Sequence, residues 1–290
     1  MNKYYALFLF VAISFGARSQ MITTIAGDGG VGIAGNGGPA TAAEFEYIYS
    51  IAVDFSGNYY ILDLQGLTVR KVNSSGIISN YAGNGIYGYA GDGGPATAAE
   101  FATDPWSITS HGNLYIADAG NDRIRYVDNT GYIYTIAGCG TAGWSGDGGQ
   151  ATAAELGFPT CVAFDNSGDM YIADCENERI RKVDASGIIT TIAGTGQAMY
   201  GGDGGAATAA SFYNPEYVAY DNNSGNIYVG DVSNDRVRII NTSGIINTFA
   251  GNGINGYSGD GGPASAAEIN SFGGMRLDNS GNVYIADCGN

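Results

Sequence analysis

GDGGPATAAE, residues Gly91–Glu100, decides the fold because the chain repeats it. Close copies lie at 146–155 (GDGGQATAAE), 202–211 (GDGGAATAAS) and 259–268 (GDGGPASAAE), and a looser copy, GNGGPATAAE, lies at 35–44. The copies are spaced about 56 residues apart, a period typical of propellers and other repeat architectures. Repetition of one motif indicates that it has a structural role rather than a catalytic one, because a catalytic site needs different residues in different roles.

Between two copies, each unit predicts four short strands. In the third unit these are VAFD (162–165), MYIAD (170–174), RIRKVD (179–184) and IITTIAG (188–194). Apolar and polar residues alternate, β-branched and aromatic residues are frequent, and turns such as NSGD carry a glycine that tolerates a positive φ. Each repeat therefore predicts a small antiparallel sheet.

Tandem four-stranded sheets of this size are typical of β-propeller blades. The predicted fold is all-β, a propeller of four-stranded blades, with the GDGG motif carrying the chain from the outer strand of one blade to the inner strand of the next. GDGG would form a sharp turn and PATAAE a short helix. The apolar residue that follows each motif is expected to pack between blades: Phe45, Phe101, Leu156, Phe212 and Ile269.

The N-terminus predicts a secretory signal over residues 1–19. Lys3 is followed by the apolar stretch 6–17, which is short for a bilayer span, and Ala17-Arg18-Ser19 fits a cleavage site. Residues 20–290 would then form the propeller domain. We expect a secreted or cell-surface protein with no transmembrane segment.

Charge and cysteine content narrow the function classes. The net charge of −16 disfavours a nucleic-acid partner. The four cysteines, Cys139, Cys161, Cys175 and Cys288, lack the spacing of a metal site, so free buried thiols are as plausible as disulfides. If one bridge forms, Cys161 with Cys175 is favoured, because these residues flank one predicted hairpin.

The repeated segments NLYIADAGNDRIRYVD (113–128), DMYIADCENERIRKVD (169–184) and NIYVGDVSNDRVRII (226–240) resemble NHL-repeat β-propellers. The long connection FAGNGINGYSGDGGPASAAE (249–268) is similar to the long-loop version seen in secreted bacterial NHL proteins and in the NHL domain of teneurin adhesion receptors. The resemblance implies a recognition platform with varied partners and, commonly, six blades.

Two departures from this pattern matter. In the first repeat, Asn36 replaces the loop aspartate and Thr68 replaces the first arginine of the third strand. The fifth repeat stops after YIADCGN, before a third strand. We therefore expect the propeller to be incomplete at its C-terminus and to be part of a longer protein.

The repeated aspartate that ends each second strand lies close in sequence to a repeated arginine. We expect structural ion pairs rather than a ligand or metal ring, pairing Asp118 with Arg123, Asp174 with Arg179 and Asp231 with Arg236. Asp63 and Asp287 are the corresponding acids of the first and fifth repeats.

The inter-blade motifs supply the candidate ligand-binding residues. An aromatic residue stands three positions before each loop aspartate, and it would either pack on the loop or form a platform for sugars or peptide side chains. The candidate residues are Tyr89, Trp144, Tyr200, Tyr257, Asp92, Asp147, Asp203 and Asp260. The loop aspartates could bind Ca²⁺, but they lack the dense acid spacing of dedicated calcium loops, so turn capping is favoured and no cofactor is expected.

Catalytic patterns are weak. His111 is the only histidine, and neither a G-x-S-x-G elbow nor a phosphate-binding loop followed by a helix is present. We expect a non-catalytic scaffold that binds protein or carbohydrate partners outside the cell. The alternative is a metal-dependent hydrolase or lactonase with an axial acidic site drawn from Glu46, Asp104 and Glu216.

Overall fold

The strands predicted from each repeat form separate antiparallel sheets. The computed structural model describes residues 22–290, so the signal sequence predicted over 1–19 lies outside the described residues. Four sheets have four strands in sequential order, and a fifth has two. The all-β fold class is confirmed.

The strands have the following bounds. The first blade contains β1 (Ile48–Val53), β2 (Tyr59–Asp63), β3 (Thr68–Val72) and β4 (Ile78–Ala82), and the second contains β5 (Pro105–His111), β6 (Asn113–Asp118), β7 (Arg123–Val127) and β8 (Ile133–Ala137). The third contains β9 (Pro159–Phe164), β10 (Met170–Asp174), β11 (Arg179–Val183) and β12 (Ile189–Ala193). The fourth contains β13 (Pro215–Tyr220), β14 (Ile227–Asp231), β15 (Arg236–Ile240) and β16 (Ile246–Ala250), and the fifth contains β17 (Phe272–Leu277) and β18 (Val283–Asp287).

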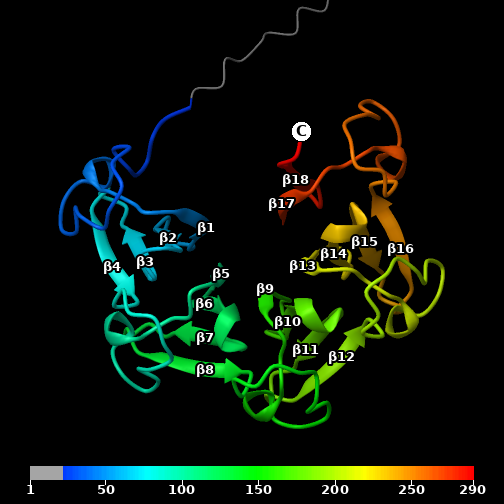
Figure 1. Cartoon of the computed structure of the whole chain (residues 1–290), viewed down its shortest axis with the longest axis horizontal. Coiled ribbons are helices and arrows are strands. Elements are labelled where there is room, and N and C mark those ends of the chain that lie inside the picture. Colours follow the sequence, from blue (N-terminus) through cyan, green and yellow to red (C-terminus); the bar gives the residue numbers. More distant parts are fainter. Residues whose placement is uncertain (1–21) are drawn as a thin grey trace, which may run out of the picture.

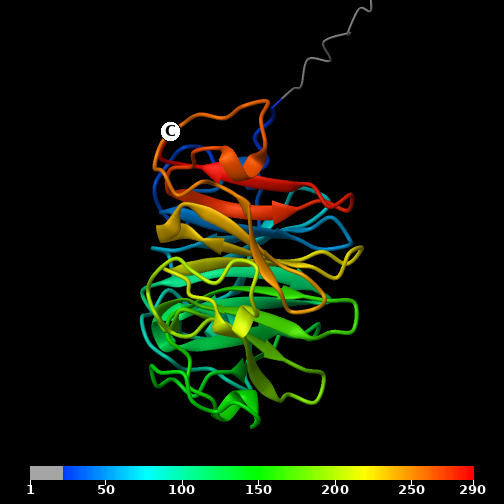
Figure 2. The same ribbon diagram turned by 90° about the vertical axis from the view of Figure 1, so that its right-hand side faces the viewer.

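The sheets are arranged as the blades of a propeller. Figure 1 shows them around a common axis in an open arc, with the first strand of each blade innermost and β4, β8, β12 and β16 at the outer edge. Figure 2 shows the strands running roughly along that axis. The first strands of neighbouring blades contact one another, from β1·β5 to β13·β17. The propeller architecture is therefore confirmed, with its blades not closed into a ring.

Aspartate-capped turns fix the hairpins between the first and second strands. Asp165 Oδ1 accepts the N–H groups of Ser167 and Asp169 at 2.8 and 3.0 Å. Gly168 completes the turn at a φ of 85°, which costs a residue without Cβ little. Turn chemistry thus sets the register of the pair β9–β10.

The core lies between blades, and the apolar residue after each motif is part of it. Phe101 is fully buried in one hydrophobic cluster with Leu62 and Val69 of the first blade and Ile116 of the second. Phe212 and Leu156 are fully buried, and Phe45 and Ile269 are nearly so. A blade hides both of its faces only against its neighbours, as the repeat pattern predicted.

The long connections end in single 3-10 turns rather than longer helices. These turns are η1 (Ala40–Ala42), η2 (Ala96–Ala98), η4 (Ala151–Ala153), η6 (Ala207–Ala209) and η8 (Ala264–Ala266). Further 3-10 turns follow the second strands: η3 (Ala119–Asn121), η5 (Cys175–Asn177) and η7 (Val232–Asn234). Gly91 has a φ of 96°, and a Cβ there would lie 2.7 Å from the Ala99 Cα. The motif glycine is required because the loop crosses its own backbone at that point.

The cysteines are free. The favoured bridge between Cys161 and Cys175 is wrong: Cys161 faces Ala173 across β9–β10, while Cys175 lies beyond the end of β10, in η5. In the described part of the chain, no helix is long and apolar enough to cross a membrane.

Candidate binding site on the inter-blade connections

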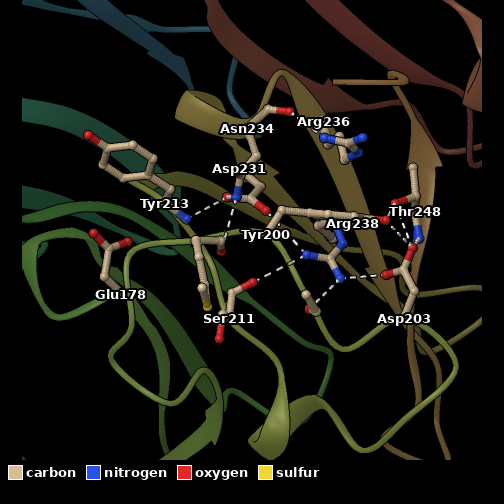
Figure 3. A network of polar contacts seen from close by, with 12 residues as sticks. Glu178, Tyr200, Asp203, Ser211, Tyr213, Asp231, Asn234, Arg236, Arg238 and Thr248 are labelled. Carbon is tan, nitrogen blue, oxygen red and sulfur yellow. Dashed lines mark hydrogen bonds and ion pairs between the residues drawn. The ribbon is translucent and has the colours of Figure 1, made fainter. Parts of the chain in front are cut away.

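A buried arginine ties each complete connection to the blade that follows it. We define the inter-blade connections as residues 27–47, 83–104, 138–158, 194–214 and 251–271. In the fourth repeat, Arg238 on β15 is fully buried and bonds both Asp203 of the connection and Asp231 at the end of β14. Figure 3 shows its guanidinium between these two carboxylates, with Tyr200 alongside. The carbonyl oxygens of Gly201 and Ser211 accept further hydrogen bonds from it.

The second and third repeats repeat this arrangement. Arg125 Nη2 lies 2.8 Å from Asp92 Oδ1, and Arg125 Nη1 lies 3.5 Å from Asp118 Oδ2. Arg181 lies 2.8 Å from Asp147 and 3.1 Å from Asp174. Three fully buried guanidinium groups therefore each join two carboxylates from different segments, and loss of one partner would leave a costly buried charge.

The ion pairs predicted with the first arginine of each third strand are wrong. Asp118, Asp174 and Asp231 pair with the second arginine, not with Arg123, Arg179 and Arg236. Although Asp118 and Arg123 are opposite each other in the β6–β7 register, the carboxylate is turned towards the Ala102 N–H and the Asn121 side chain. The second arginine, Arg125, reaches Asp118 Oδ2, the oxygen that also accepts from the Asn121 amide.

The first arginine of each third strand instead contacts the aromatic residue of the connection. Arg123 Cζ lies 3.8 Å from the centroid of the Tyr89 ring, Arg179 lies 4.3 Å from Trp144, and Arg236 lies 3.9 Å from Tyr200. The same guanidinium groups donate to backbone carbonyls, such as Arg123 Nη2 to Cys139 O at 2.6 Å. Cation–π contact thus holds one face of each ring.

These rings remain accessible. Tyr89 and Tyr200 are each 41% exposed, and Trp144 is 55% exposed. The Tyr89 hydroxyl donates to Asp92 Oδ2 at 2.8 Å, and Tyr200 donates to Asp203 in the same way. Both hydroxyls also contact a threonine on the outer strand, so the rings lie along the outer edge of the arc, where Figure 1 shows the connections. Packing on the loop, one of the two predicted roles, is observed, and the platform role stays a prediction.

The pKa values of two loop aspartates, Asp92 and Asp203, shift in the opposite direction from those of the strand aspartates Asp174 and Asp231. Burial acts to raise the pKa of Asp92, but hydrogen bonds from Thr135 and the Arg125 guanidinium outweigh it and hold that pKa below its usual value. The pKa of Asp203 is lowered in the same way by Thr248, Tyr200 and Arg238. For Asp174 and Asp231, burial dominates and raises the pKa to about 6. Asp92 and Asp203 are therefore anionic, and one oxygen of each is occupied by an arginine.

A second set of acids joins successive blades, and the sequence analysis did not identify it. Asp122 and Glu178 are left-handed, with φ of 52° and 53°. Asp122 Oδ1 accepts the N–H of Phe158, and Glu178 Oε2 accepts the N–H of Asn214, each the last residue of the connection that leads into the next blade. Burial raises the pKa of Glu178 to about 7. The signal was present as the acid before the first arginine in NDR, NER and NDR.

The first repeat keeps this geometry with different side chains. Arg70 is almost fully buried and donates to Asn36 Oδ1 at 3.1 Å and to Glu44 O at 2.9 Å. Asp63 accepts the N–H groups of Glu46 and Tyr47. The amide of Asn36 therefore takes the acceptor role of the loop aspartate.

The acids considered for an axial site are not brought together as a metal centre. Glu46 is exposed, and burial raises the pKa of the half-buried Glu216. Across residues 22–290, no group of three or more His, Cys, Asp or Glu side chains is placed to hold a metal ion. A central cavity of about 390 Å³ is lined instead by residues such as Tyr49, Trp106 and Tyr217. The single histidine, His111, stacks on Phe164 at 4.6 Å.

Comparison with known proteins shows that this geometry is similar to that of NHL-repeat β-propellers. The profile of the teneurin NHL domain matches residues 139–201. Teneurin-4 of Mus musculus is 28% identical over 232 residues, which is 71% of this chain and 8% of teneurin-4. The resemblance to NHL-repeat propellers seen in the sequence is confirmed, and the repeats are similar to those of the teneurin NHL domain.

Solved structures show the same fold at low sequence identity. An auxiliary nutrient binding protein from Bacteroides ovatus has a TM-score of 0.55 and 23% identity, covering 71% of this chain and 49% of that one. A streptogramin B lyase has a TM-score of 0.53 and 12% identity, covering 83% of this chain and 62% of the other. Binding proteins and enzymes both share the architecture, so the likeness establishes the fold alone.

Proposed function

We propose that this chain is a non-catalytic binding scaffold of the cell exterior that recognises protein or glycan partners through the connections on its outer edge. The observation that carries the proposal is the repeated unit of aromatic ring, arginine and aspartate. In each unit the ring is held by cation–π contact and still exposes a large fraction of its surface.

The unit suits recognition for two physical reasons. Tyr and Trp provide rigid amphipathic contact area, and their position is fixed before a partner arrives, so little entropy is lost on binding. The neighbouring loop carboxylates are partly accessible, with 31% of the Asp92 side chain and 42% of the Asp147 side chain exposed. An exposed ring beside an anionic acceptor can stack on a sugar or an apolar side chain and accept its hydroxyl or amide hydrogen bonds.

The proteins to which this chain is similar also support a binding function. The chain is similar to part of the teneurins and to auxiliary nutrient binding proteins, whose name describes binding. The N-terminal signal predicted from the sequence directs the protein outside the cell, where protein and glycan ligands are available.

Binding of the labelled full chain to glycan and peptide arrays tests the proposal. We expect a Tyr89→Ala/Trp144→Ala/Tyr200→Ala variant to lose at least about tenfold in affinity for every ligand that the wild type binds. Phe55→Ala is the control, since Phe55 is an exposed aromatic residue in the turn between β1 and β2, outside the connections.

Either of two results would refute the scaffold. One is unchanged binding by the triple variant. The other is hydrolysis of ester or lactone substrates by the wild type that a Glu216→Gln variant abolishes, because this result would support the axial enzyme instead.

A further inference from the structure

The repeated unit of ring, arginine and aspartate has a different ring in the third repeat. Tyr89 and Tyr200 belong to the second and fourth repeats, and Trp144 occupies the same place in the third. A phenol carries a hydroxyl group that both donates and accepts a hydrogen bond, whereas an indole has only an N–H donor. The third repeat therefore shows what the unit becomes when that hydroxyl is absent.

In the fourth repeat the tyrosine hydroxyl completes a small polar network. Tyr200 donates to Asp203 Oδ2 at 2.8 Å, and its hydroxyl lies 3.2 Å from Thr248 Oγ1. The Thr248 N–H also donates to Asp203 Oδ2, at 3.0 Å, and Figure 3 shows these three residues together. In these repeats Oδ2 of the loop aspartate is therefore used by the chain itself. The second repeat forms the same bonds among Tyr89, Asp92 and Thr135.

In the third repeat this network is open. Thr191 holds the place of Thr248 in the strand register, but its buried Oγ1 has no hydrogen-bond partner. Asp147 Oδ1 accepts from Arg181, and no residue within 22–290 donates to Asp147 Oδ2. The Asp147 side chain is 42% exposed, whereas its counterparts in the second and fourth repeats are each 31% exposed. An accessible carboxylate oxygen is thus left without the donors that its counterparts have.

Trp144 also lies differently on the arginines of its blade. Tyr200 lies over both arginines of β15, with Arg236 Cζ at 3.9 Å and Arg238 Cζ at 4.8 Å from the ring centroid. Trp144 lies over Arg179 at 4.3 Å and, within the described part of the chain, contacts no second guanidinium. The indole is 55% exposed. One face of the indole is therefore held by an arginine, while a large part of its surface is free.

We propose that the third connection is a saccharide-binding site, in which a neutral sugar ring stacks on Trp144 and one of its hydroxyl groups donates to Asp147 Oδ2. The sugar hydroxyl takes the place that the tyrosine hydroxyl fills in the second and fourth repeats. This inference rests on the proposed function and assigns glycans, rather than peptides, to this one connection.

The charges around Trp144 favour a neutral ligand. A cation would approach two guanidinium groups, since Arg179 lies against the indole and Arg181 pairs with Asp147, and an anion would approach the Asp147 carboxylate. A sugar has an apolar C–H face that packs on an aromatic ring, and its hydroxyl groups donate to a carboxylate. Trp144 and Asp147 offer these two partners in one connection.

The test measures binding of methyl glycosides of glucose, galactose, mannose and N-acetylglucosamine to the full chain by ligand-observed NMR. Trp144→Tyr supplies the missing hydroxyl, so that the chain's own phenol occupies Asp147 Oδ2. Trp144→Phe is the matched control, because it provides a similar aromatic face without a hydroxyl. We expect Trp144→Tyr to bind at least about tenfold more weakly than Trp144→Phe.

The fourth repeat allows the site to be moved. In a Trp144→Tyr background, Tyr200→Trp removes the phenol from Asp203 Oδ2 and places an indole on the fourth connection. Because a carboxylate oxygen accepts more than one hydrogen bond, the remaining donor, Thr248, does not block it. We expect the double variant to bind the glycosides at least about threefold more tightly than Trp144→Tyr alone. Thermal unfolding of each variant verifies that it is folded.

The outcomes separate this inference from the proposed function. Equal binding by Trp144→Tyr and Trp144→Phe would overturn the saccharide site, and so would the absence of any gain from Tyr200→Trp. If none of the methyl glycosides binds, the saccharide site is refuted, but peptide binding that the triple alanine variant loses would leave the scaffold standing. If neither glycans nor peptides bind, both the inference and the proposed function fail.

Discussion

The fourth and fifth connections follow the same backbone path, but their aromatic side chains differ in how exposed they are. Gly194 and Thr195 donate to the carbonyls of Ala207 and Ala210, and Gly251 and Asn252 form the same bonds with Ala264 and Ala267. Tyr200, covered by arginines of β15, is 41% exposed, whereas Tyr257 is 70% exposed. The path of a connection is therefore set by its own glycines and backbone bonds, while the order of its side chains depends on the outer strands of the following blade.

The largest expected effect comes from making the fourth repeat resemble the fifth. Arg238→Ala leaves Asp231 buried without its cation, so we expect the free energy of unfolding to fall by about 3–5 kcal/mol in urea titrations. Arg276→Ala removes an exposed arginine of β17 and should cost less than about 0.5 kcal/mol. A loss below about 1 kcal/mol for Arg238→Ala would show that the buried network does not hold the connection.

Substituting alanine for the motif glycines tests whether the backbone path of a connection is set by its own glycines. Gly202 has a φ of 93°, and a Cβ would lie 2.6 Å from Ala210 Cα, so Gly202→Ala should cost more than about 2 kcal/mol. Gly204 has a φ of 79° but no atom within 4 Å of an added Cβ, so Gly204→Ala should cost only about 1 kcal/mol.

The same change at Gly259 extends this test to the fifth connection, where a Cβ would lie 2.7 Å from Ala267 Cα. Hydrogen exchange should show Gly259→Ala opening residues 251–268. If exchange there is unchanged, the fifth connection does not hold its path by itself.

The contact between Glu178 and the fourth blade should depend on pH. Burial raises the pKa of Glu178 to about 7 from 4.5, so the folded state binds the proton more tightly than the unfolded state. The stability that this group contributes is present below pH 4.5 and is lost as pH rises towards 7. Glu178→Gln keeps an acceptor for the Asn214 N–H without the charge.

We therefore expect Glu178→Gln to gain on the order of 1–2 kcal/mol relative to the wild type between pH 4.5 and pH 8, measured by denaturant unfolding at each pH. Glu176→Gln controls for loss of one negative charge. A gain for Glu178→Gln that is constant with pH would contradict the assignment.

The smallest effect compares two hydroxyl groups. Tyr200→Phe removes hydrogen bonds to Asp203 and Thr248 and should cost about 0.5–1.5 kcal/mol. Tyr257→Phe removes one bond from a more exposed ring and should be almost neutral in thermal unfolding. Equal costs would mean that the outer strand does not order the aromatic residue.

Much of the fold could be predicted from the sequence, because its determinants are local and repeated. Alternation defined the strands, turn residues such as Gly168 defined the hairpins, and the apolar residue after each motif marked the packing between blades. Because the same pattern of strands and turns occurs in each copy, a chance pattern in one repeat does not alter the predicted fold.

The pairing of the arginines could not be predicted, because it depends on side-chain direction. Asp118 is opposite Arg123 in the sheet, but the Ala102 N–H and the Asn121 amide turn its carboxylate towards Arg125. The acid at 122 was missed for a related reason: its left-handed backbone aims the carboxylate at the connection to the next blade, and the residue pattern does not reveal that conformation.

Each second arginine of a third strand reaches the connection that precedes its own blade. The unit of duplication therefore runs from one connection to the end of the following fourth strand, and each such unit contains both the arginine and the loop acceptor that it binds. Whole units of this kind can therefore be added or removed while the arginine and acceptor that join a connection to its blade stay together.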